Sequence, residues 1–553
     1  MPTFKSQLYL ILILLAAAFF RFYHLGSVPP SPSLDEVSIG YNAYSILKTG
    51  ADEYSTKFPL LLRAYDDWRP ALYVYFVLPF IWLLGLTAIS VRLPSIMMSL
   101  ITVAVVYDLT RRLTKLIFTN MNQDNYEAMG LAASLLLAIS PWHIYISRLG
   151  HEANLGLFTV VLAVYFFIRS LVEKVQINLV ASLILFAISL YAYQSQKVIT
   201  PLLVTAVVVL FLSYWKKHFS SLFWGLLISG LVALPILIVS FEPQAMARFA
   251  GTTAFNESHP LYRESQQKYV QAVVNGDRLG ILANSRYFAM ARIFSQNYLS
   301  HWKASWLFSG TLNEQHKVPY LGLLFPWELP LIIIGLFVVL KSIKGQVGVK
   351  SFLLIWLLSA PIPASIASQT PHAMRAYTFL PVWQIFGGIG LVYLFKTIVR
   401  YINPHAIIAG GCSLIVVSLA LLYRNYFTVF PKYHSRSFQY PLAQALKYAI
   451  SNADRYDKVV ISNQNNLYQS YMFYLFFSGY DPAVYQRQGG TKSGGYDKTH
   501  QIEKYEFRPI DWPKEKVSSS LYVANADDLP PDVPSLFSAN LLSGETAIRV
   551  VEK

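Results

Sequence analysis

Charged residues are scarce in this sequence, and cysteine is nearly absent. Only 14% of the 553 residues are Asp, Glu, Lys or Arg, while 54% are hydrophobic and 15% aromatic. Ordinary soluble domains carry about 25% charged residues, so this composition excludes an ordinary soluble protein. The single cysteine, Cys412, has no second thiol in the chain with which to pair, which excludes an intramolecular disulfide.

Long hydrophobic runs take the place of the missing charges. A helix needs roughly 20 apolar residues to cross about 30 Å of hydrocarbon. About eleven runs approach this length, near residues 7–24, 92–110, 128–142, 154–170, 178–194, 198–214, 220–240, 327–340, 351–367, 378–395 and 406–423. The sequence therefore predicts a polytopic α-helical membrane protein with about eleven transmembrane helices. We expect the first helix to be retained, because no convincing signal-cleavage site follows it.

The formal net charge is +15, and the basic residues behind it are distributed in a pattern that matches the predicted spans. Lys and Arg gather in alternate loops, for example at Arg111 and Arg112 and at Lys216 and Lys217, as the positive-inside rule expects of cytoplasmic loops. This distribution argues against a nucleic-acid partner. It also makes the apolar stretch 71–86 an interfacial helix, since one more crossing would invert every later loop. The loops at 26–91 and 241–326, and the chain after residue 424, are then predicted to face outward.

A change of composition predicts a domain border near residue 424. Residues 1–424 hold the predicted spans, and residues 425–553 have the pattern of a small soluble α/β domain. Its expected helices lie at 441–451 and 467–477, and its expected strands at 458–462, 520–523 and 547–551. The pairs Gly489-Gly490 and Gly494-Gly495 favour a surface loop, because they do not follow a predicted strand as a phosphate-binding glycine loop would.

The first outer loop is predicted to hold two outward-facing surface helices. Ser33 or Asp35 can cap a helix that runs to about Leu47 and stops at Gly50. Pro70 suits the first turn of the next helix. The second outer loop carries aromatic residues typical of a membrane interface. They are Phe294, Tyr298, Trp302, Trp306 and Phe308.

Polar and charged side chains gather at the predicted outer ends of the spans, where an unpaired charge is costly. They include Asp35, Glu36, Asp66, Asp67, Arg69, Arg148, His151, Glu152, Gln194, Gln196, Lys197, His372 and Arg375. Simpler explanations exist: Asp35 could only cap a helix, and Arg148 and Lys197 could only reach lipid headgroups. His151 has no second His or Cys at ligand spacing, so no structural metal site is predicted. A bound divalent metal is left open.

A carboxylate beside cations at a membrane surface suits chemistry on a lipid phosphate. Asp35 follows the first span, where a lowered dielectric can raise its proton affinity and let it act as a base on a hydroxyl. Arginine forks and lysine ammonium groups stabilise the charge that a phosphate leaving group accumulates.

Six short motifs in residues 5–425 resemble a known family. They are Leu34-Asp35-Glu36, Trp68-Arg69-Pro70, Val91-Arg92-Leu93-Pro94-Ser95, the run from Ser147 to Asn154, the run from Tyr193 to Lys197, and Pro371-His372-Ala373-Met374-Arg375. Together they resemble the GT-C glycosyltransferases of the protein O-mannosyltransferase and lipid A aminoarabinose transferase group, and the Asp-Glu pair is the most specific of them. The resemblance implies a GT-C-like fold and inverting transfer of a monosaccharide from a polyprenyl-phosphate donor, at the outer face of the lipid bilayer, to a protein, lipid or glycan acceptor.

The resemblance also implies roles for single residues. Asp35 matches the catalytic aspartate. The expected donor-phosphate ligands are Arg69, Lys197, His372 and Arg375, and the expected sugar or acceptor ligands are Glu36, Arg148, His151 and Glu152. Arg69 stands where the lipid A transferases usually have a lysine before two prolines, and Glu152 stands where relatives often carry Asp. The Trp-Trp-Asp signature of oligosaccharyltransferases is absent, which argues against transfer to asparagine.

Two other functions stay open. One is a lipid-linked sugar flippase or transporter, which should place charges near mid-membrane and show internal repeats; neither feature is clear in the sequence. The other is a polymerase or ligase that acts on longer glycans. The lack of an obvious retention signal favours the plasma membrane of a prokaryote.

Overall fold

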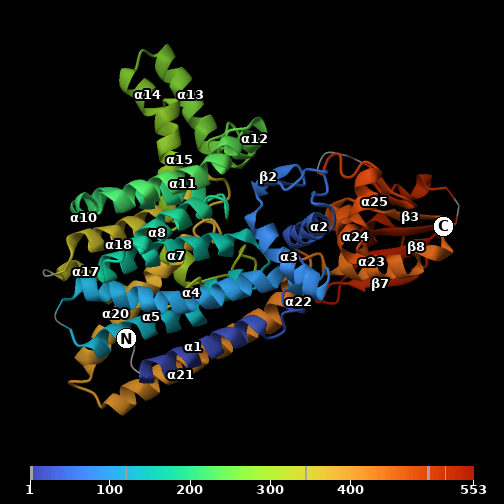
Figure 1. The fold of residues 1–553 in the computed structure, drawn as a ribbon. Helices are drawn as coiled ribbons and strands as arrows, with labels where there is room; N and C mark the ends of the chain where they lie inside the picture. The colour runs from blue at the N-terminus through green and yellow to red at the C-terminus, as the bar shows by residue number, and fades with distance from the viewer. Residues whose placement is uncertain (1–3, 120, 343–344, 495–498, 517–518) are drawn as a thin grey trace. The chain divides into compact units, whose positions relative to one another are not determined.

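A computed structural model describes residues 4–119, 121–342, 345–494, 499–516 and 519–553. The fold is mostly helical, with strands gathered near the C-terminus (Figure 1). The chain divides into two compact units: residues 1–20, 98–146 and 153–420 form the first, and residues 21–97, 147–152 and 421–553 form the second. The second unit thus joins the first outer loop to the C-terminal part. The domain border expected at residue 424 stays a prediction.

Most predicted spans are helices of the length that a membrane requires. Within the described residues, seven helices are long and apolar enough to cross. They are α1 (Phe4–Phe22), α4 (Ala88–Ile117), α7 (Glu152–Glu173), α11 (Phe219–Ser240), α18 with α19 (Val347–Ser359, Ile362–Ile366), η1 with α20 (Tyr377–Phe379, Leu380–Ile398) and α21 continued through η2 and α22 (Pro404–Tyr423, Arg424–Val429, Phe430–His434). The pair α5 (Gln123–Ile139) and α6 (Pro141–Ser147) adds an eighth, bent by 58°.

Three predicted spans fall on shorter helices. These are α8 (Gln176–Ser189), α9 (Gln196–Leu210) and α17 (Glu328–Lys341); the short α10 (Leu212–Lys217) follows α9. The polytopic helical fold is therefore confirmed, while the number of eleven crossings stays a prediction. The apolar stretch 71–86 forms the 13-residue helix α3 (Leu72–Leu84).

Glycine brings two helices of the first unit into close contact. α20 packs against both α17 and α5. A Cβ added at Gly335 of α17 would lie 1.9 Å from the carbonyl oxygen of Phe386, and one added at Gly390 of α20 would lie 1.8 Å from that of Leu331. Any larger residue would push the backbones apart, so these two glycines permit the close helix pair.

The second outer loop folds into five helices within the first unit. They are α12 (Pro243–Thr252), α13 (Pro260–Val274), α14 (Arg278–Ala283), α15 (Arg286–Ser300) and α16 (Ala304–Phe308). The rings of Phe294 and Tyr298 stack along α15 with centroids 5.9 Å apart, and Trp302 continues this row. Trp306 and Phe308 are each only 8% exposed. These two side chains therefore pack inside the protein, and the expectation that they face a membrane interface is wrong.

The first outer loop begins with the helix that the sequence predicts. In α2 (Leu34–Thr49), Ser33 accepts a hydrogen bond from the backbone N–H of Glu36, whose side chain accepts one from the Ser33 N–H. This reciprocal capping box fixes the start of the helix. Gly50, with φ of 74°, ends it in the left-handed conformation that glycine tolerates best.

A β-hairpin follows where the sequence predicted a helix start. β1 (Leu61–Ala64) pairs antiparallel with β2 (Asp67–Pro70). Tyr65 and Asp66 form the turn with φ of 54° and 63°, a conformation usually signalled by Asn-Gly or Asp-Gly. Pro70 therefore ends a strand, and the next helix starts at Leu72.

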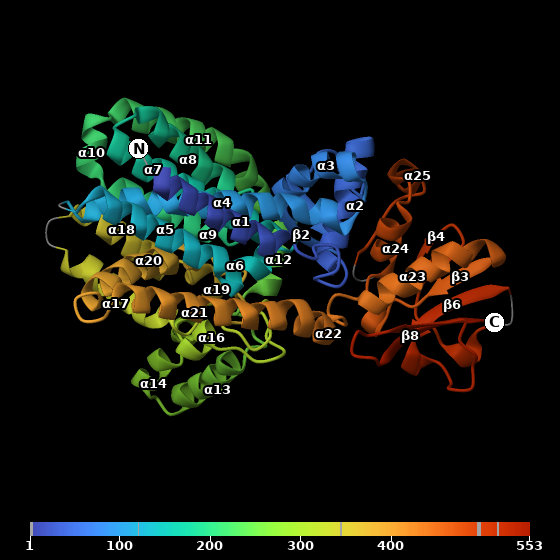
Figure 2. The same ribbon diagram turned by 90° about the horizontal axis from the view of Figure 1, so that it is seen from below.

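The described C-terminal part of the second unit forms a six-stranded sheet of order β4-β5-β3-β6-β8-β7. The strands are β3 (Lys458–Ile461), β4 (His500–Ile502), β5 (Tyr505–Phe507), β6 (Ser520–Asn525), β7 (Phe537–Asn540) and β8 (Thr546–Glu552). β3 lies parallel to β5 and β6, and the other pairs are antiparallel. Helix α23 (Tyr440–Asn452) packs against β6, β7 and β8 (Figure 2). The predicted helices and strands of this region are confirmed; β4, β5 and β7 were not predicted.

A buried polar cluster joins the first outer loop to the C-terminal part. Glu53 is fully buried and accepts hydrogen bonds from Asn42 Nδ2 at 3.1 Å, Thr491 Oγ1 at 2.7 Å and Tyr471 Oη at 3.3 Å. Burial raises the pKa of Glu53 to about 7, although these donors oppose the shift. Gln486 adds a bond from Nε2 to the carbonyl oxygen of Asp52 at 3.0 Å.

This contact corrects the surface loop expected around the C-terminal glycines. A Cβ on Gly490 would lie 2.7 Å from the Glu53 carbonyl oxygen, and one on Gly494 would lie 2.5 Å from Tyr54 Oη. The segment from Gly490 to Gly494 thus packs against the first outer loop. Gly495 lies outside the described residues. Helices α24 (Ser470–Ser478) and α25 (Pro482–Arg487) pack on α2 beside this contact.

Candidate functional site

Asp35 stands in the first turn of α2 with a carboxylate that water can reach. Its side chain is 49% exposed, and Oδ1 accepts a hydrogen bond of 2.9 Å from Nη1 of Arg69. Arg69 lies on β2, and only 6% of its side chain is exposed. A buried cation therefore holds an accessible carboxylate at the end of a capped helix.

Arg69 has more hydrogen-bonding capacity than the surrounding protein uses. Its Nε and Nη2 are buried, and neither finds a hydrogen-bond partner among the described residues. Burial by itself lowers the pKa of Arg69, but the charges of Asp35 and Glu152 outweigh it and raise that pKa. The guanidinium is therefore cationic. A buried donor without a partner costs about 1–3 kcal/mol, and an anionic oxygen would remove that cost.

His151 lies between two carboxylates. Its Nε2 is 3.8 Å from Oδ2 of Asp35, and its Nδ1 is 3.6 Å from Oε2 of Glu152. These distances exceed those of hydrogen bonds. Glu152 is 3% exposed, and its Oε2 has no hydrogen-bond partner in the described part of the chain. An imidazole in this position can move a proton away from Asp35 after a small shift.

Glu36, the neighbour of Asp35, lies in the protein interior. Its Oε1 accepts from Arg92 Nε at 2.7 Å and from the Gly150 N–H at 2.9 Å, and its Oε2 accepts from Arg92 Nη2 at 3.1 Å and from the Ser33 N–H at 2.8 Å. The two side chains of the ion pair are at most 1% exposed. Because both carboxylate oxygens are occupied, this geometry favours a positioning role over the expected sugar or acceptor contact.

Arg148 is also fully buried. Nη1 donates to the carbonyl oxygen of Arg21 at 2.8 Å, and Nη2 donates to that of Val28 at 2.6 Å. The guanidinium carbon lies 5.4 Å and 5.0 Å from the ring centroids of Tyr426 and Phe427. These contacts favour a role in fixing the backbone before α2. They do not favour the expected sugar or acceptor contact, nor the simpler explanation of a side chain that reaches lipid headgroups.

Arg92 is a positioning residue for which the sequence analysis assigned no role. Besides Glu36, it donates to the carbonyl oxygens of Leu25 at 2.8 Å and Ser31 at 2.9 Å. Arg92 and Arg148 together hold the segment from residue 21 to residue 31, which leads into α2. The signal was present in the sequence: an arginine at the start of an apolar span needs a buried partner.

The remaining three predicted ligands belong to the first unit. Lys197 lies in the first turn of α9, which packs on α19, and the segment with His372 and Arg375 follows α19. The Arg375 side chain donates from Nη1 to the Ser368 carbonyl oxygen at 2.6 Å. The structure thus groups six of the nine predicted residues in the second unit and three in the first. A single site that unites all nine stays a prediction.

Two further histidines surround His372. Its N–H donates to His301 Nε2 at 3.2 Å, and its ring lies 4.9 Å from the ring of His316. Burial lowers the pKa of His301 to about 4, although its Nδ1, 2.8 Å from the Asn297 carbonyl oxygen, opposes the shift. His301 is therefore neutral and orients the His372 backbone. Neither histidine was predicted, because each lies more than 50 residues from His372 with no spacing that links them.

The described residues do not form a candidate metal site. Among the side chains that the structure describes, no cluster of three or more His, Cys, Asp and Glu residues could hold a metal ion.

Comparison with known proteins shows a relation in structure. No family model matches this sequence, and no curated protein sequence does. ArnT from Cupriavidus metallidurans in the apo state is similar with a TM-score of 0.54 and 12% identity, over 99% of this chain and 98% of that one. The same protein bound to undecaprenyl phosphate gives a TM-score of 0.53 at 11% identity.

A second similar structure is the apo oligosaccharyltransferase of Archaeoglobus fulgidus, with a TM-score of 0.50 and 13% identity. The match covers 86% of this chain but 64% of that one, so this chain spans less than two thirds of its length. ArnT, the lipid A aminoarabinose transferase, and the archaeal enzyme are both GT-C glycosyltransferases. The resemblance expected from the motifs is confirmed, and we conclude that this chain has the GT-C fold, with similarity to ArnT over nearly its whole length.

Proposed function

We propose that this chain is an inverting glycosyltransferase that moves a monosaccharide from a polyprenyl-phosphate donor to an acceptor hydroxyl at the outer face of a prokaryotic plasma membrane. One observation carries the proposal. The half-exposed carboxylate of Asp35 is held by a buried Arg69 whose Nε and Nη2 have no hydrogen-bond partner among the described residues. The fold supports it by analogy, because one similar ArnT structure contains undecaprenyl phosphate.

The reaction follows from these groups. The acceptor hydroxyl oxygen attacks the anomeric carbon from the face opposite the phosphate and forms the new glycosidic bond. The bond from that carbon to the phosphate oxygen breaks, and its electron pair leaves with the polyprenyl phosphate. The hydroxyl proton passes to Asp35, the general base. Attack from the opposite face inverts the configuration.

The other predicted residues divide by their surroundings. Arg69 offers its unused N–H groups to the donor phosphate, and we assign Lys197, His372 and Arg375 to the same anion. His151 lies beside Asp35, and Glu152 lies beside His151. Both act on the sugar or acceptor and on the released proton. Four hydrogen bonds hold the Glu36 carboxylate inside the protein, and Arg148 is equally enclosed. We therefore assign both to positioning the segment that carries Asp35.

A donor-conversion assay tests the proposal. Purified protein in proteoliposomes receives a polyprenyl-phosphate donor with a radiolabelled sugar, together with protein, lipid or glycan extracts as acceptors. A transferase releases unlabelled polyprenyl phosphate and labels one acceptor with a single inverted sugar. Movement of intact donor across the bilayer without release would indicate a flippase. Addition of long glycans in one step would indicate a ligase. Either of these results contradicts the proposal.

A further inference from the structure

The second outer loop contains a helical hairpin whose distal end exposes aliphatic side chains. α13 ends at Val274, a turn through Asn275 and Gly276 leads into α14, and α15 returns. Aliphatic side chains around this turn that are between 50% and 80% exposed include Val273, Val274, Leu279 and Leu282. Large exposed apolar side chains grouped around one turn of a folded protein indicate an interaction surface.

The opposite end of the same hairpin is well packed. Tyr262 of α13 is 7% exposed, and Ala289 and Ile293 of α15 are 1% and 0% exposed. These residues form one apolar cluster together with Ala254. The hairpin therefore has a core of its own at the base, and the exposed aliphatic side chains belong to its far end.

Basic side chains flank the apolar end. Residues 260–300 contain five basic and two acidic side chains, a net charge of +3. Arg278 stands next to Leu279, and Arg286 begins α15; both are exposed. Aliphatic side chains bordered by arginine are the composition of helices that lie in the interface of an anionic membrane.

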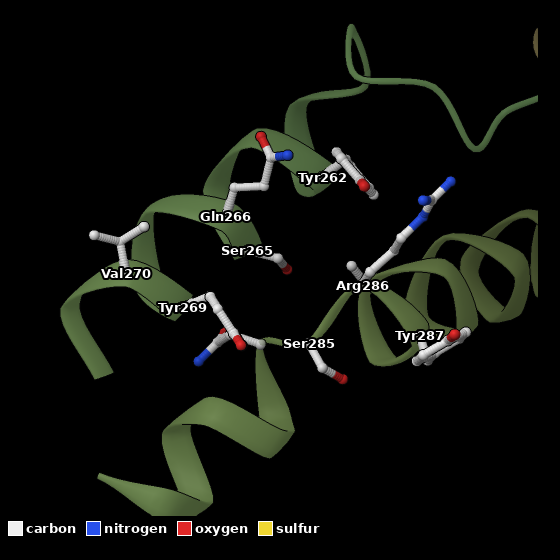
Figure 3. Close-up of a pocket in the computed structure, with 10 residues that line it drawn as sticks. Tyr262, Ser265, Gln266, Tyr269, Val270, Ser285, Arg286 and Tyr287 are labelled. Carbon is white, nitrogen blue, oxygen red and sulfur yellow. The ribbon is translucent and has the colours of Figure 1, made fainter. Parts of the chain in front are cut away.

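A groove between α13 and α15 continues this composition. It has a volume of about 600 Å³, and Tyr262, Tyr269, Arg286 and Tyr287 contribute to its lining. Figure 3 shows Tyr262 and Ser265 directed toward the start of α15, where Arg286 lies. Tyrosine with arginine is typical of the headgroup layer of a bilayer.

In the chain, the hairpin lies between the candidate span α11 and the shorter apolar helix α17, which the sequence predicts as a span. Two residues separate the end of α11 at Ser240 from the start of α12 at Pro243, and α15 is followed by α16 and then α17. α13 has 15 residues, a length of about 22 Å at 1.5 Å per residue. In Figures 1 and 2, α13 and α14 project beyond the other helices of the first unit, and in Figure 1 α13 runs across the direction of α11. If α11 stands upright in a membrane, a helix that runs across its direction is oriented along the membrane plane.

From these observations we propose that the α13–α15 hairpin docks on the adjacent membrane leaflet, with Val273, Val274, Leu279 and Leu282 among the acyl chains and Arg278 and Arg286 at anionic phospholipid headgroups. The partner is the lipid bilayer itself. The hairpin fixes the second outer loop against the membrane, whatever reaction the rest of the chain performs.

Spin-label accessibility tests this docking on the full chain. Because Cys412 is the only cysteine and is exposed on α21, Cys412→Ser gives a background without thiols. Nitroxides are placed at Leu279→Cys and, in a separate variant, at Val274→Cys, in nanodiscs of phosphatidylcholine with phosphatidylglycerol. Both labels should collide readily with oxygen and several-fold less with a water-soluble nickel chelate than a label at the exposed Ser543→Cys does. A label on the native Cys412 gives the lipid-facing reference.

Substitution of the two arginines gives the second part of the experiment. Arg278→Glu with Arg286→Glu should raise the chelate accessibility of the Leu279 label in nanodiscs that contain phosphatidylglycerol, and should change it little in pure phosphatidylcholine. The docking is refuted if the Leu279 and Val274 labels behave like the Ser543 label in both lipids. It is also refuted if both reagents are excluded, because a protein partner then covers the patch.

Discussion

Asp35 and Glu36 are neighbours in sequence, yet they occupy opposite environments. Glu36 is at most 1% exposed, and four hydrogen bonds, two of them from Arg92, hold its two oxygens. Asp35 is 49% exposed and accepts a hydrogen bond from Arg69, which itself keeps two buried nitrogens without a partner among the described residues. The protein itself supplies hydrogen-bond partners to both oxygens of Glu36. In the other ion pair, two donor nitrogens of Arg69 are left for a ligand.

This difference separates two functions that an acidic pair can combine. A buried and fully bonded carboxylate stabilises the segment that contains it, because removing either partner leaves an uncompensated charge. An accessible carboxylate beside an unsaturated cation can exchange protons and bind substrate. The α-helical spacing causes the division: adjacent residues in the first turn of α2 point about 100° apart, one toward Arg92 and the other toward Arg69.

Replacement of Asp35 should have the largest effect on activity. We expect Asp35→Asn to lower turnover by about 10² to 10⁴, since the amide keeps the shape but cannot accept the proton. The rate of radiolabelled sugar transfer, normalised to folded protein, measures this. Glu36→Gln is the matched control: it should lower the amount of folded protein more than the turnover of each folded molecule. Equal losses of turnover in both variants would show that Asp35 and Glu36 do not have separate catalytic and structural roles.

Arg92→Met tests the structural pair. It leaves Glu36 buried without its cation, which should cost about 3–5 kcal/mol of stability. Thermal unfolding in detergent measures the loss. Arg436→Met removes a surface ion pair with side chains 50% and 64% exposed, and should cost less than about 1 kcal/mol. Similar losses in these two variants would deny the buried pair its special role.

Glu53 gives a pH-dependent test of the contact between the first outer loop and the C-terminal part. Its pKa is about 7 in the folded protein against an ordinary 4.5, so the folded state binds its proton more tightly than the unfolded state does. The resulting stability is fully present below about pH 4.5 and is lost as pH rises toward 7, by up to about 3 kcal/mol.

We expect Glu53→Gln, which mimics the protonated carboxyl group, to flatten this decline. Unfolding temperatures of the wild-type protein and the variant between pH 4.5 and pH 8 measure it. Glu545→Gln, at a side chain 64% exposed, should leave the profile unchanged. A wild-type stability that rises over this pH range, or a decline of the same size in Glu53→Gln, would contradict the assignment.

Arg69→Lys tests whether the unpartnered nitrogens of Arg69 bind the donor phosphate. Lysine keeps the charge toward Asp35 but removes the planar fork that Nε and Nη2 present. Losing one charged hydrogen bond to the phosphate costs about 1.5–3 kcal/mol, or roughly a 10- to 100-fold fall in kcat/KM for the donor. Steady-state kinetics at varied donor concentration measure the fall. An unchanged kcat/KM would mean that the unpartnered nitrogens do not contact the donor.

The helix cap gives the smallest expected effect. Ser33→Ala removes the hydroxyl that accepts the Glu36 N–H and should cost about 1 kcal/mol. Hydrogen exchange should quicken at the first turn of α2. Ser543→Ala, at an exposed C-terminal position, is the control and should leave that exchange unchanged. Unaltered protection in Ser33→Ala would mean that packing alone holds the start of the helix.

The sequence predicted the features that depend on composition and local pattern. Hydrophobic runs located the helices, and Ser33 with Gly50 located both ends of α2. The β1–β2 hairpin was missed because a Tyr65-Asp66 turn lacks the usual glycine signal. β4, β5 and β7, with three or four residues each, are too short for a period of two to be recognised.

The candidate site was only partly predictable for a different reason. Motifs selected Asp35 and Arg69, which the structure joins directly. The resemblance gave Asp35 and Glu36 different roles, but it could not reveal that Glu36 is enclosed and fully bonded, because that depends on Arg92, 56 residues further along the chain. Nor could the motifs connect Glu53 with Thr491, which are 438 residues apart. Long-range pairing is decided by tertiary packing, which single-sequence patterns do not contain.

Equilibrium binding of the radiolabelled donor to Asp35→Asn, in the same nanodiscs in which transfer is measured, tests the central claim most directly. If Asp35 is the general base and Arg69 holds the phosphate, the variant binds the donor with an affinity near that of the wild-type protein while transfer is lost. Normal transfer by the variant, or a loss of binding large enough to explain the whole loss of transfer, would contradict the account.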